Sequence, residues 1–570
     1  MPGKMTGKEK EFFPAPKEEI LMRRRLSALF LSMLLVAVIA APGWSGTLDA
    51  LPQWPDSAMY GVVNLEKPNE MVQRVVNSYL FKVITAIQPD IKMAEEWLRQ
   101  FPVTSASVVF GLGEKGFSLQ GAVRFSDAKK DILARMAEGK GQEGDVDALI
   151  NSPVPGELVL TPFEGSTYAV VSGGAALALL SVEQDMVLLG FTPEDLAAAR
   201  GALSDGSKRI KLDRRVPQGS FFFFHDNGMA ASELQAESDG FLGAPVGNLL
   251  AEFGVNASDK GFDFSVFTNM AKVFSLVSDA PSSPLSKDDR ILLGGGKPWF
   301  TLVGKAMLDK KHFQTVRDAA AGGDSDAAEF VEFLEGAKQF GLDEDAILKI
   351  LKTVGMVFGG QTKLFGSPLP GGYLYLSGEK KEVDLLLPLM EMAARESGMP
   401  FEPVTKDGWT AFYALKDPVD FVMGIKDGVI LAGFLSLEAI DAAPELSDRM
   451  NALYGNDSLQ GFLHLDAKVV RDTVLSLLNP EGPWAPFISE ESDLVEGIPY
   501  ILEGLKGALE FRSLDILASD MERADFTILT EEAKQADIDA ITAMAAKWSS
   551  LAEQGKEGEG EEGKEEEKKP

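Results

Sequence analysis

The chain offers few side chains that could carry catalytic chemistry. It has no cysteine and only three histidines, His225, His312 and His464. Disulfides, thiolate metal sites, a cysteine nucleophile and a lipoprotein anchor are therefore excluded. His225 and His464 each lie close to an aspartate, Asp226 and Asp466, as a general base would. No G-x-S-x-G motif accompanies either, so we interpret both as strand-end histidines beside the N-cap aspartate of the next helix. We predict no catalytic residue.

Two glycine-rich segments resemble phosphate-binding loops without meeting their requirements. Gly111, Gly113 and Gly116 match the G-x-G-x-x-G spacing, but a dinucleotide loop must open a helix. Residues 117–121 read as extended, which predicts a hairpin turn instead. Residues 294–297 lack the Ser or Thr that follows the lysine of a phosphate loop, so they read as a flexible lead-in to a strand. We predict no nucleotide and no other cofactor.

Clusters of acidic residues are the remaining candidates for a metal site. None matches the twelve-residue calcium loop with its central glycine and terminal glutamate. Asp324 and Asp343 each precede an apolar helical pattern, so we interpret them as helix caps. We predict no metal site.

One run of four aromatic residues could bind an apolar ligand. Phe221, Phe222, Phe223 and Phe224 are consecutive, in a chain with 35 Phe and 8 Tyr. Such a run puts two rings on each face of a strand, so either both faces are covered or one lines an apolar cavity. Core packing is the ordinary explanation. The cavity alternative makes these four residues our candidates for binding an apolar ligand or lipid.

A repeated block indicates how the elements are organised. Gly165 and Gly190 recur as Gly408 and Gly433, and both pairs are 243 residues apart (408 − 165 and 433 − 190). In each copy an extended run opens after the first glycine, and a Gly-Phe step leads into a helical-looking segment, which is 437–440 in the second copy. The repeated residues are turn glycines, strand hydrophobics and helix starts. The block therefore indicates architecture and not a site.

The length of the chain indicates how many domains it has, and its charge indicates which partners are excluded. A chain of 570 residues exceeds the ~250–300 residues at which single cores stop growing, so at least two domains are expected. The net charge is −31 and the pI is about 4.6. Nucleic-acid affinity depends on Lys and Arg contacts to phosphates, so we predict no nucleic-acid partner. The same charge disfavours an anionic membrane surface.

The N-terminal part has the layout of an export signal. Residues 22–25 form a charged region, and the sixteen residues from Leu26 to Ala41 form an apolar one. Small residues follow in 41–45, where a signal peptidase could cleave. Sixteen residues fall short of the ~20 that span a bilayer. We predict export to the periplasm or the outside; the alternative is an uncleaved membrane anchor. The start of the protein is open between Met1 and Met22.

The order of runs and turns predicts an α+β fold with two tandem duplicated units, each with a mainly antiparallel sheet and packed helices. About four successive strands with no helix between them occupy residues 157–191. The predicted segments are a leader and export signal (1–46), a first unit (47–280), a linker (281–290), a second unit (291–530), a C-terminal helix (531–552) and a disordered acidic tail (553–570).

The pattern from Leu51 and Pro52 to Tyr60, the export signal and the repeated block together resemble an uncharacterised family of exported bacterial proteins. That resemblance implies no catalytic residues. We expect a non-enzymatic envelope protein that binds an apolar small molecule or lipid. The alternative is a protein-interaction scaffold with an envelope protein as partner, and a third hypothesis is an exported hydrolase that uses His225 or His464. The oligomeric state stays open.

Overall fold

The computed structural model describes residues 47–54, 59–78, 81, 97–113, 116–152, 158–172, 174–216, 219–228, 231–232, 247–258, 260–273, 283–306, 308–364, 367–396, 398–416, 419–489, 492–520 and 522–565. The expected leader and export signal lie outside these residues. In the part that is described, no helix is both long enough and apolar enough to cross a membrane.

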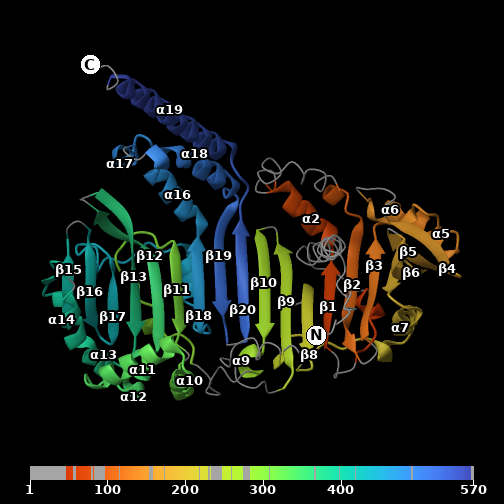
Figure 1. Cartoon of the computed structure of the whole chain (residues 1–570), viewed down its shortest axis with the longest axis horizontal. Coiled ribbons are helices and arrows are strands. Elements are labelled where there is room, and N and C mark those ends of the chain that lie inside the picture. Colours follow the sequence, from red (N-terminus) through yellow and green to blue (C-terminus); the bar gives the residue numbers. More distant parts are fainter. Residues whose placement is uncertain are drawn as a thin grey trace, which may run out of the picture.

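One antiparallel sheet of 20 strands organises the described chain (Figure 1). From one edge to the middle its order is β4 (Val159–Glu164), β5 (Thr167–Ser172), β6 (Ala175–Glu183), β7 (Met186–Gly190), β3 (Gly116–Phe125), β2 (Val103–Gly113), β1 (Met59–Glu66), β8 (Ser220–Asp226), β9 (Leu249–Ser258) and β10 (Gly261–Thr268). From the middle to the other edge it is β20 (Arg523–Thr530), β19 (Phe511–Ala518), β18 (Gly461–Asp466), β11 (Phe300–Lys305), β12 (Thr353–Leu364), β13 (Ser367–Ser377), β17 (Val429–Phe434), β16 (Phe421–Lys426), β15 (Ala411–Leu415) and β14 (Glu402–Pro403).

The strands of the two expected units join in this single sheet. Strand β10 pairs with β20 from Gly261 opposite Leu529 to Phe267 opposite Arg523. Cross-strand hydrogen bonds between side chains accompany the pairing; Thr527 Oγ1, for example, donates to Asp263 Oδ1 at 2.9 Å. The mainly antiparallel α+β class predicted from the sequence is confirmed.

Several local predictions are confirmed as well. Strands β4 to β7 follow one another without a helix. Gly113 pairs with Gly116 across the β2–β3 hairpin, as the extended run after the glycines predicts. Gly165 and Gly408 have φ values of +57° and +77°, which glycine adopts readily in turns.

Helices and short loops cover parts of both faces of the sheet. The helices are α2 (Pro68–Asn77), α5 (Lys130–Ala137), α6 (Asp145–Ile150), α7 (Pro193–Ser204), α9 (Met270–Val273), α10 (Lys310–Ala321), α11 (Ser325–Lys338), α12 (Glu344–Ile350), α13 (Lys380–Val383), α14 (Leu387–Glu396), α15 (Asp448–Tyr454), α16 (Ala467–Leu477), α17 (Ala485–Ser489), α18 (Ser492–Gly507) and α19 (Gln535–Glu565). Because α19 runs to Glu565, the described helix includes much of the segment expected to be a tail.

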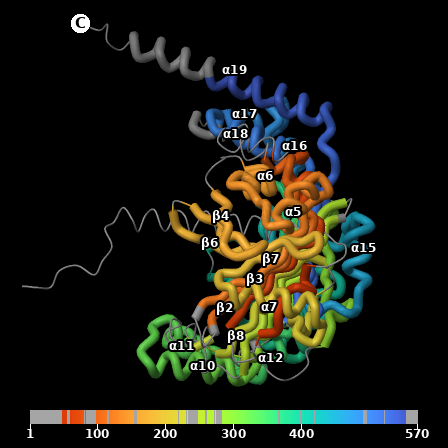
Figure 2. The backbone as a smooth tube through the Cα atoms, turned by 90° about the vertical axis from the view of Figure 1, so that its right-hand side faces the viewer, coloured from red at the N-terminus to blue at the C-terminus, as the bar shows by residue number. Residues whose placement is uncertain are grey.

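We call the side of the sheet that carries Val62 and Val303 face A, and the side that carries Val63 and Leu302 face B. The strand pairing from β1 to β11 places Val62 and Val303 on the same side. Figure 2 shows α15 on one side of the sheet and α10 and α11 on the other.

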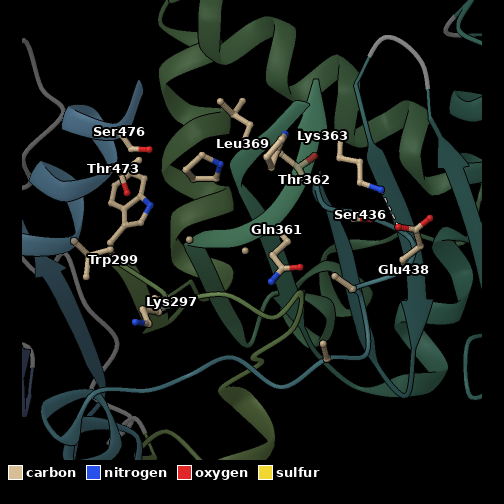
Figure 3. A pocket seen from close by; sticks show the side chains of 17 residues that line it. Lys297, Trp299, Gln361, Thr362, Lys363, Leu369, Ser436, Glu438, Thr473 and Ser476 are labelled. Carbon is tan, nitrogen blue, oxygen red and sulfur yellow. Dashed lines mark hydrogen bonds and ion pairs between the residues drawn. The ribbon is translucent and has the colours of Figure 1, made fainter. Parts of the chain in front are cut away.

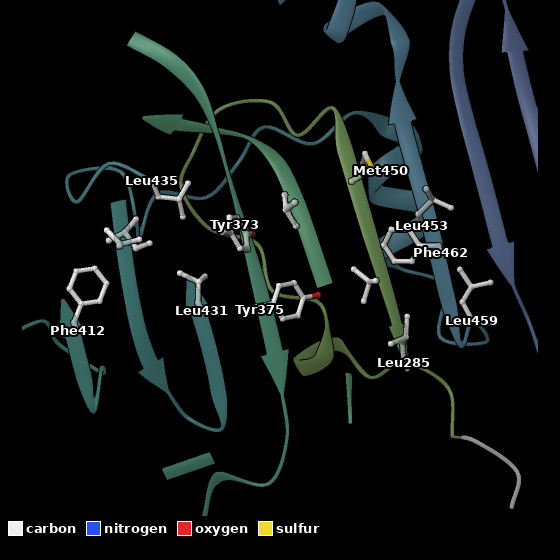
Figure 4. Close-up of a cluster of buried hydrophobic side chains, with 14 of the residues drawn as sticks. Leu285, Tyr373, Tyr375, Phe412, Leu431, Leu435, Met450, Leu453, Leu459 and Phe462 are labelled. Atoms are coloured by element: carbon white, nitrogen blue, oxygen red, sulfur yellow. The ribbon is translucent and has the colours of Figure 1, made fainter. Parts of the chain in front are cut away.

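Face A is buried in both halves. In the first half it packs against residues 48–54, residues 210–212 and α7. In the second half it packs against Leu285, α15 and the segment after β17, in the cluster drawn in Figure 4. Tyr373 and Tyr375, at the centre of that cluster, donate their hydroxyls to the carbonyls of Ile291 and Asp289 at 2.9 Å. Residues 285–293 are thereby fixed to the sheet.

Among the residues that the structure describes, helices cover face B toward its two ends. Helices α2, α5 and α6 pack on it in the first half. Helices α11 to α14 pack on β15, β16 and β17 in the second half, where Ile425 is fully buried. The strands between these two sets of helices carry exposed apolar side chains on face B.

The second copy of the repeated block differs from the expected helix. Residues 193–204 form α7, with a capping box between Thr192 and Asp195. Residues 437–440 form a turn instead. The carbonyls of Ile440 and Ala442 accept hydrogen bonds from Gly294 and Gly295, so the chain is held against the segment before β11 and does not continue as a helix.

Candidate ligand-binding face and pocket

The four phenylalanines proposed from the sequence divide between the two faces of β8. Phe221 and Phe223 are 3 % and 5 % exposed and belong to the core of face A. Phe222 and Phe224 point to face B and are partly buried. Phe222 lies opposite Val63 of β1. Within the run, only Phe222 and Phe224 therefore lie on face B.

An unbroken row of apolar side chains crosses nine adjacent strands on face B. Directly opposed residues of an antiparallel pair point to the same side of the sheet. With strands about 4.8 Å apart, the row is about 38 Å long. We call it the apolar row, and its members in sheet order are Phe264, Phe526, Ile516, Leu463, Leu302, Met356, Leu374, Ala432 and Met423.

The rows on either side of the apolar row have the same character. One comprises Phe262, Ile528, Leu514, Leu465, Phe300, Phe358, Gly372 and Phe434. The other comprises Val266, Ala524, Ala518, Gly461, Gly304, Val354, Leu376, Ile430 and Ile425. All members of the three rows are apolar residues or glycine. We call the three rows together the apolar surface.

The middle of this surface is open to solvent. The most exposed members are Leu302 (41 %), Val354 (43 %), Phe434 (49 %) and Leu374 (52 %). Two of their sequence neighbours on face A, Val303 and Tyr375, are 0 % and 1 % exposed. An antiparallel sheet with one face on the core normally presents polar side chains on the other. A contiguous exposed apolar patch of this kind marks a binding surface.

A pocket of about 720 Å³ lies beside the apolar surface (Figure 3). It lies between the β12–β13 hairpin and α16, next to Lys297 and Trp299, which come just before β11. Four segments line it: Lys297 and Trp299, residues 359–363 with 368–370, Ser436 to Ala442 in part, and Val469, Thr473 and Ser476 of α16.

Close backbone contacts between glycines shape the floor of the pocket. Gly296 and Gly359 have φ values of +73° and +119°. A Cβ added to Gly296 would lie 2.3 Å from the Gly359 carbonyl oxygen, and one added to Gly359 would lie 2.2 Å from the Lys297 carbonyl oxygen. Only glycine permits this approach. This close approach of the two backbone segments places Lys297 at the pocket.

Trp299 connects the pocket with the apolar surface. Its ring lines the pocket and stacks on Phe358 with centroids 5.5 Å apart. Phe358 is a member of the apolar surface, so the two features share a wall. The indole Nε1 of Trp299 is buried and has no acceptor among the described residues. In Figure 3 it lies on the side of the ring toward Leu369. Buried indole N–H groups usually have an acceptor.

Both lysines at the pocket are paired with carboxylates. Two lysines and one carboxylate, Lys297, Lys363 and Glu438, line it. Lys363 Nζ lies 2.9 Å from Glu438 Oε2, and this hydrogen bond raises the pKa of Lys363 and lowers that of Glu438. Lys297 Nζ is 3.7 Å from Glu445 Oε2 in an exposed ion pair, which is a loose contact. Lys297 is therefore the more available cation.

Two of the three histidines, His225 and His464, lie on face A of the sheet. His225 stacks on Tyr60 with ring centroids 5.0 Å apart, and its Nε2 is 3.3 Å from Asn248 Nδ2. His464 lies directly opposite Thr301 on face A and is 1 % exposed. Asp466 caps α16 by accepting from Val469 N. The cap predicted for Asp466 is confirmed, and so are those of Asp324 and Asp343.

His464 pairs with an aspartate that the sequence does not place near it. His464 Nδ1 lies 2.6 Å from Asp515 Oδ1, and Arg449 Nε lies 2.6 Å from Asp515 Oδ2. Burial raises the pKa of Asp515, but the hydrogen bonds from His464 and Arg449 outweigh burial and hold this pKa below its ordinary value. The group is enclosed in the protein, which suits a structural role.

Among the described residues, no group of three or more His, Asp or Glu side chains is arranged to hold a metal ion. No family model matches the chain, and neither a curated protein nor a solved structure matches it.

The residues that form the apolar surface carry no motif. Leu302, Met356 and Leu374 belong to apolar runs such as 299–303 and 373–376. What distinguishes these strands is that polar residues do not alternate with apolar ones, as they normally do in an antiparallel sheet with one face in water. That signal is ambiguous in the sequence, because such a run also fits a strand covered on both faces.

Proposed function

We propose that this chain is a non-enzymatic exported protein of the cell envelope that binds the acyl chains of a lipid, or a similar apolar ligand, on the apolar surface. The observation that carries the proposal is the apolar row, which crosses nine strands and reaches its greatest exposure at Leu374. Because exposed apolar area is costly in water, covering it with hydrocarbon is favourable.

The chemistry of the surface favours hydrocarbon over a protein partner. Protein interfaces carry about one hydrogen bond per 100–200 Å², but the three rows offer only apolar side chains and glycine. The acyl chains of one membrane leaflet extend about 15 Å, half of the ~30 Å hydrocarbon core. Phe264 and Met423, at the two ends of the row, pack with helices. The seven strands between them span about 29 Å, which is about the length of two such chains laid end to end.

The proposal of duplicated units is supported by strand order. Outward from the β10–β20 pair, one half of the sheet runs 10, 9, 8, 1, 2, 3, 7, 6, 5, 4 and the other runs 20, 19, 18, 11, 12, 13, 17, 16, 15, 14. Each strand of the second series is the first-series strand plus ten. A tandem duplication accounts for this, together with the repeated glycines.

Export is proposed from the charged and apolar segments at residues 22–41, and a nucleic-acid partner is disfavoured by the charge of −31. We propose no catalytic role for His225 or His464. His464 is enclosed, and both histidines are explained by packing and hydrogen bonds.

A protein-interaction scaffold is the second candidate, and α11 carries the observation that favours it. Phe330 and Phe333 are 42 % and 64 % exposed and stack with centroids 6.1 Å apart. Exposed aromatic pairs are typical anchors of protein interfaces. Retention of a defined envelope protein that Phe333→Ser abolishes, without any lipid on the protein, would support this alternative.

The test of lipid binding uses the full-length chain, purified without detergent, and a fluorescent fatty acid. The Leu374→Asp variant puts a charge in the middle of the apolar surface, where a bound acyl chain would have to desolvate it. We expect affinity to fall at least about tenfold. Because Leu374 is half exposed, the melting temperature should change little.

Met399→Asp is the matched control. Met399 is 55 % exposed, close to the 52 % of Leu374, but it lies in the segment after α14 and outside the apolar surface. The proposal requires that this variant bind like the parent. Equal affinities for all three proteins, or no saturable binding at all, would refute it. Mass spectrometry of organic extracts should also find stoichiometric lipid on protein purified from its own envelope.

A further inference from the structure

The pocket beside the apolar surface combines apolar lining residues with polar side chains that hydrocarbon alone would leave without partners. It shares the Trp299–Phe358 wall with that surface. Its other lining groups include Gln361, Thr473 and Ser476, whose side chains can donate hydrogen bonds. A ligand that lies along the apolar surface and ends in the pocket would therefore have an apolar body and a polar end.

We propose that the pocket binds the anionic phosphodiester headgroup of a lipid whose acyl chains lie on the apolar surface. This inference rests on the proposed function and adds the class of headgroup. The lining carries two ammonium groups and one carboxylate, and the carboxylate of Glu445 lies 3.7 Å from Lys297 in an exposed ion pair. Exposed ion pairs are weak, so Lys297 can exchange Glu445 for another anion. A phosphodiester with a single negative charge matches the ammonium group of Lys297 in that exchange.

A second observation points to an acceptor in the pocket. The buried Nε1 of Trp299 lacks an acceptor in the described part of the chain. A phosphate oxygen supplies an acceptor, and the same phosphate is in range of a flexible lysine such as Lys297. Lys363 is already held by Glu438 at 2.9 Å, so Lys297 is the cation that the headgroup would recruit.

The experiment compares two fluorescent lipids. They have identical acyl chains and carry the same fluorophore. The first is phosphatidylglycerol, and the second is diacylglycerol, which lacks the phosphate. The full-length chain should bind phosphatidylglycerol about tenfold more tightly, as expected for a charged hydrogen bond to a phosphate. Lys297→Gln should remove most of that preference and leave diacylglycerol binding unchanged.

Lys468→Gln is the matched control, because Lys468 is an exposed lysine of α16 that does not line the pocket. It should leave both affinities as in the parent. Trp299→Phe, which keeps the ring and removes the N–H, should reduce the preference for phosphatidylglycerol by about threefold. Glu438→Gln frees Lys363 and should increase the preference.

The outcomes separate this inference from the proposed function. Equal binding of both lipids, or equal effects of Lys297→Gln and Lys468→Gln, would overturn the headgroup assignment while acyl-chain binding stands. Failure to bind either lipid would overturn both. Displacement of phosphatidylglycerol by millimolar inorganic phosphate, with no effect of acyl-chain length, would identify a free-phosphate site and overturn the lipid assignment.

Discussion

Phe221 and Phe222 are consecutive in β8, but their side chains lie on opposite faces of the sheet. Phe221 is 3 % exposed and packs in the core of face A, where its ring also lies 3.7 Å from the Arg214 guanidinium carbon. Phe222 is partly buried on face B, opposite Val63. One residue of the pair therefore belongs to the fold, and the other belongs to the proposed binding side.

Replacing each phenylalanine with alanine should show the two faces as a difference in stability. Phe221→Ala leaves a core cavity and should lower the free energy of unfolding by about 3–5 kcal/mol. Phe222→Ala should lower it by less than half of that, because Phe222 is only partly buried. Urea unfolding measures both values. Similar losses of stability for both variants would contradict the assignment of the two faces.

Asp515 predicts how stability depends on pH. Hydrogen bonds from His464 and Arg449 lower its pKa in the folded protein, whereas the unfolded value is about 3.9. The folded state thus favours the carboxylate, so the stabilisation is complete above about pH 4 and is lost as pH falls through the folded pKa. Burial raises the pKa of Asp289, but hydrogen bonds from Lys305, Ser286 and Thr353 lower it further than burial raises it. Asp289 therefore contributes stability over the same pH range as Asp515.

We expect Asp515→Asn to lower the free energy of unfolding at pH 7 by about 1–3 kcal/mol, because it breaks a buried charged hydrogen bond. The asparagine has no carboxylate that acid could protonate. The free energy of unfolding of the variant should therefore fall less steeply between pH 5 and pH 2 than that of the parent. Urea unfolding at a series of pH values checks both statements. A slope identical to that of the parent would show that Asp515 does not contribute to the acid transition.

Gly261 tests the join between the two halves of the sheet. It begins β10 with φ +149°, and a Cβ there would lie 1.8 Å from the carbonyl oxygen of Ile528 in β20. Gly261→Ala should therefore lower the free energy of unfolding by about 2–3 kcal/mol, the size expected for local backbone strain.

Gly336→Ala is the control for the glycine substitution. Gly336 lies inside α11 with no atom near the added methyl group, so alanine should stabilise the helix by about 0.5–1 kcal/mol. Opposite signs for the two variants in thermal unfolding support the close contact between β10 and β20. A neutral Gly261→Ala would mean that these strands do not approach each other as described.

The sequence predicts the parts of this fold that are decided locally. Turn glycines and apolar runs indicate the hairpins from β4 to β7, and Asp324 and Asp343 are recognisable as caps because capping requires a carboxylate just before a helix. Pairing of β10 with β20 joins residues about 260 positions apart, and no local pattern specifies such a partner.

The candidate site depends on these distant contacts. His464 meets Asp515 because β18 pairs with β19, and not because of its nearer neighbour Asp466. Leu302 and Val303 are equally apolar in the sequence. Only the placement of the helices decides that Val303 is buried and that Leu302 faces solvent. The pocket likewise needs Lys297, Gln361 and α16, which meet only in the folded chain.

The most direct test of acyl-chain binding is photolabelling. A photoreactive fatty acid is irradiated with the full-length chain, and the labelled residues are identified by mass spectrometry. We predict adducts concentrated on the exposed part of the apolar surface, at Leu302, Val354, Leu374 and Phe434, and competition by unlabelled fatty acid. Labelling confined to Phe330 and Phe333 of α11, or labelling that unlabelled fatty acid does not reduce, would contradict the proposal.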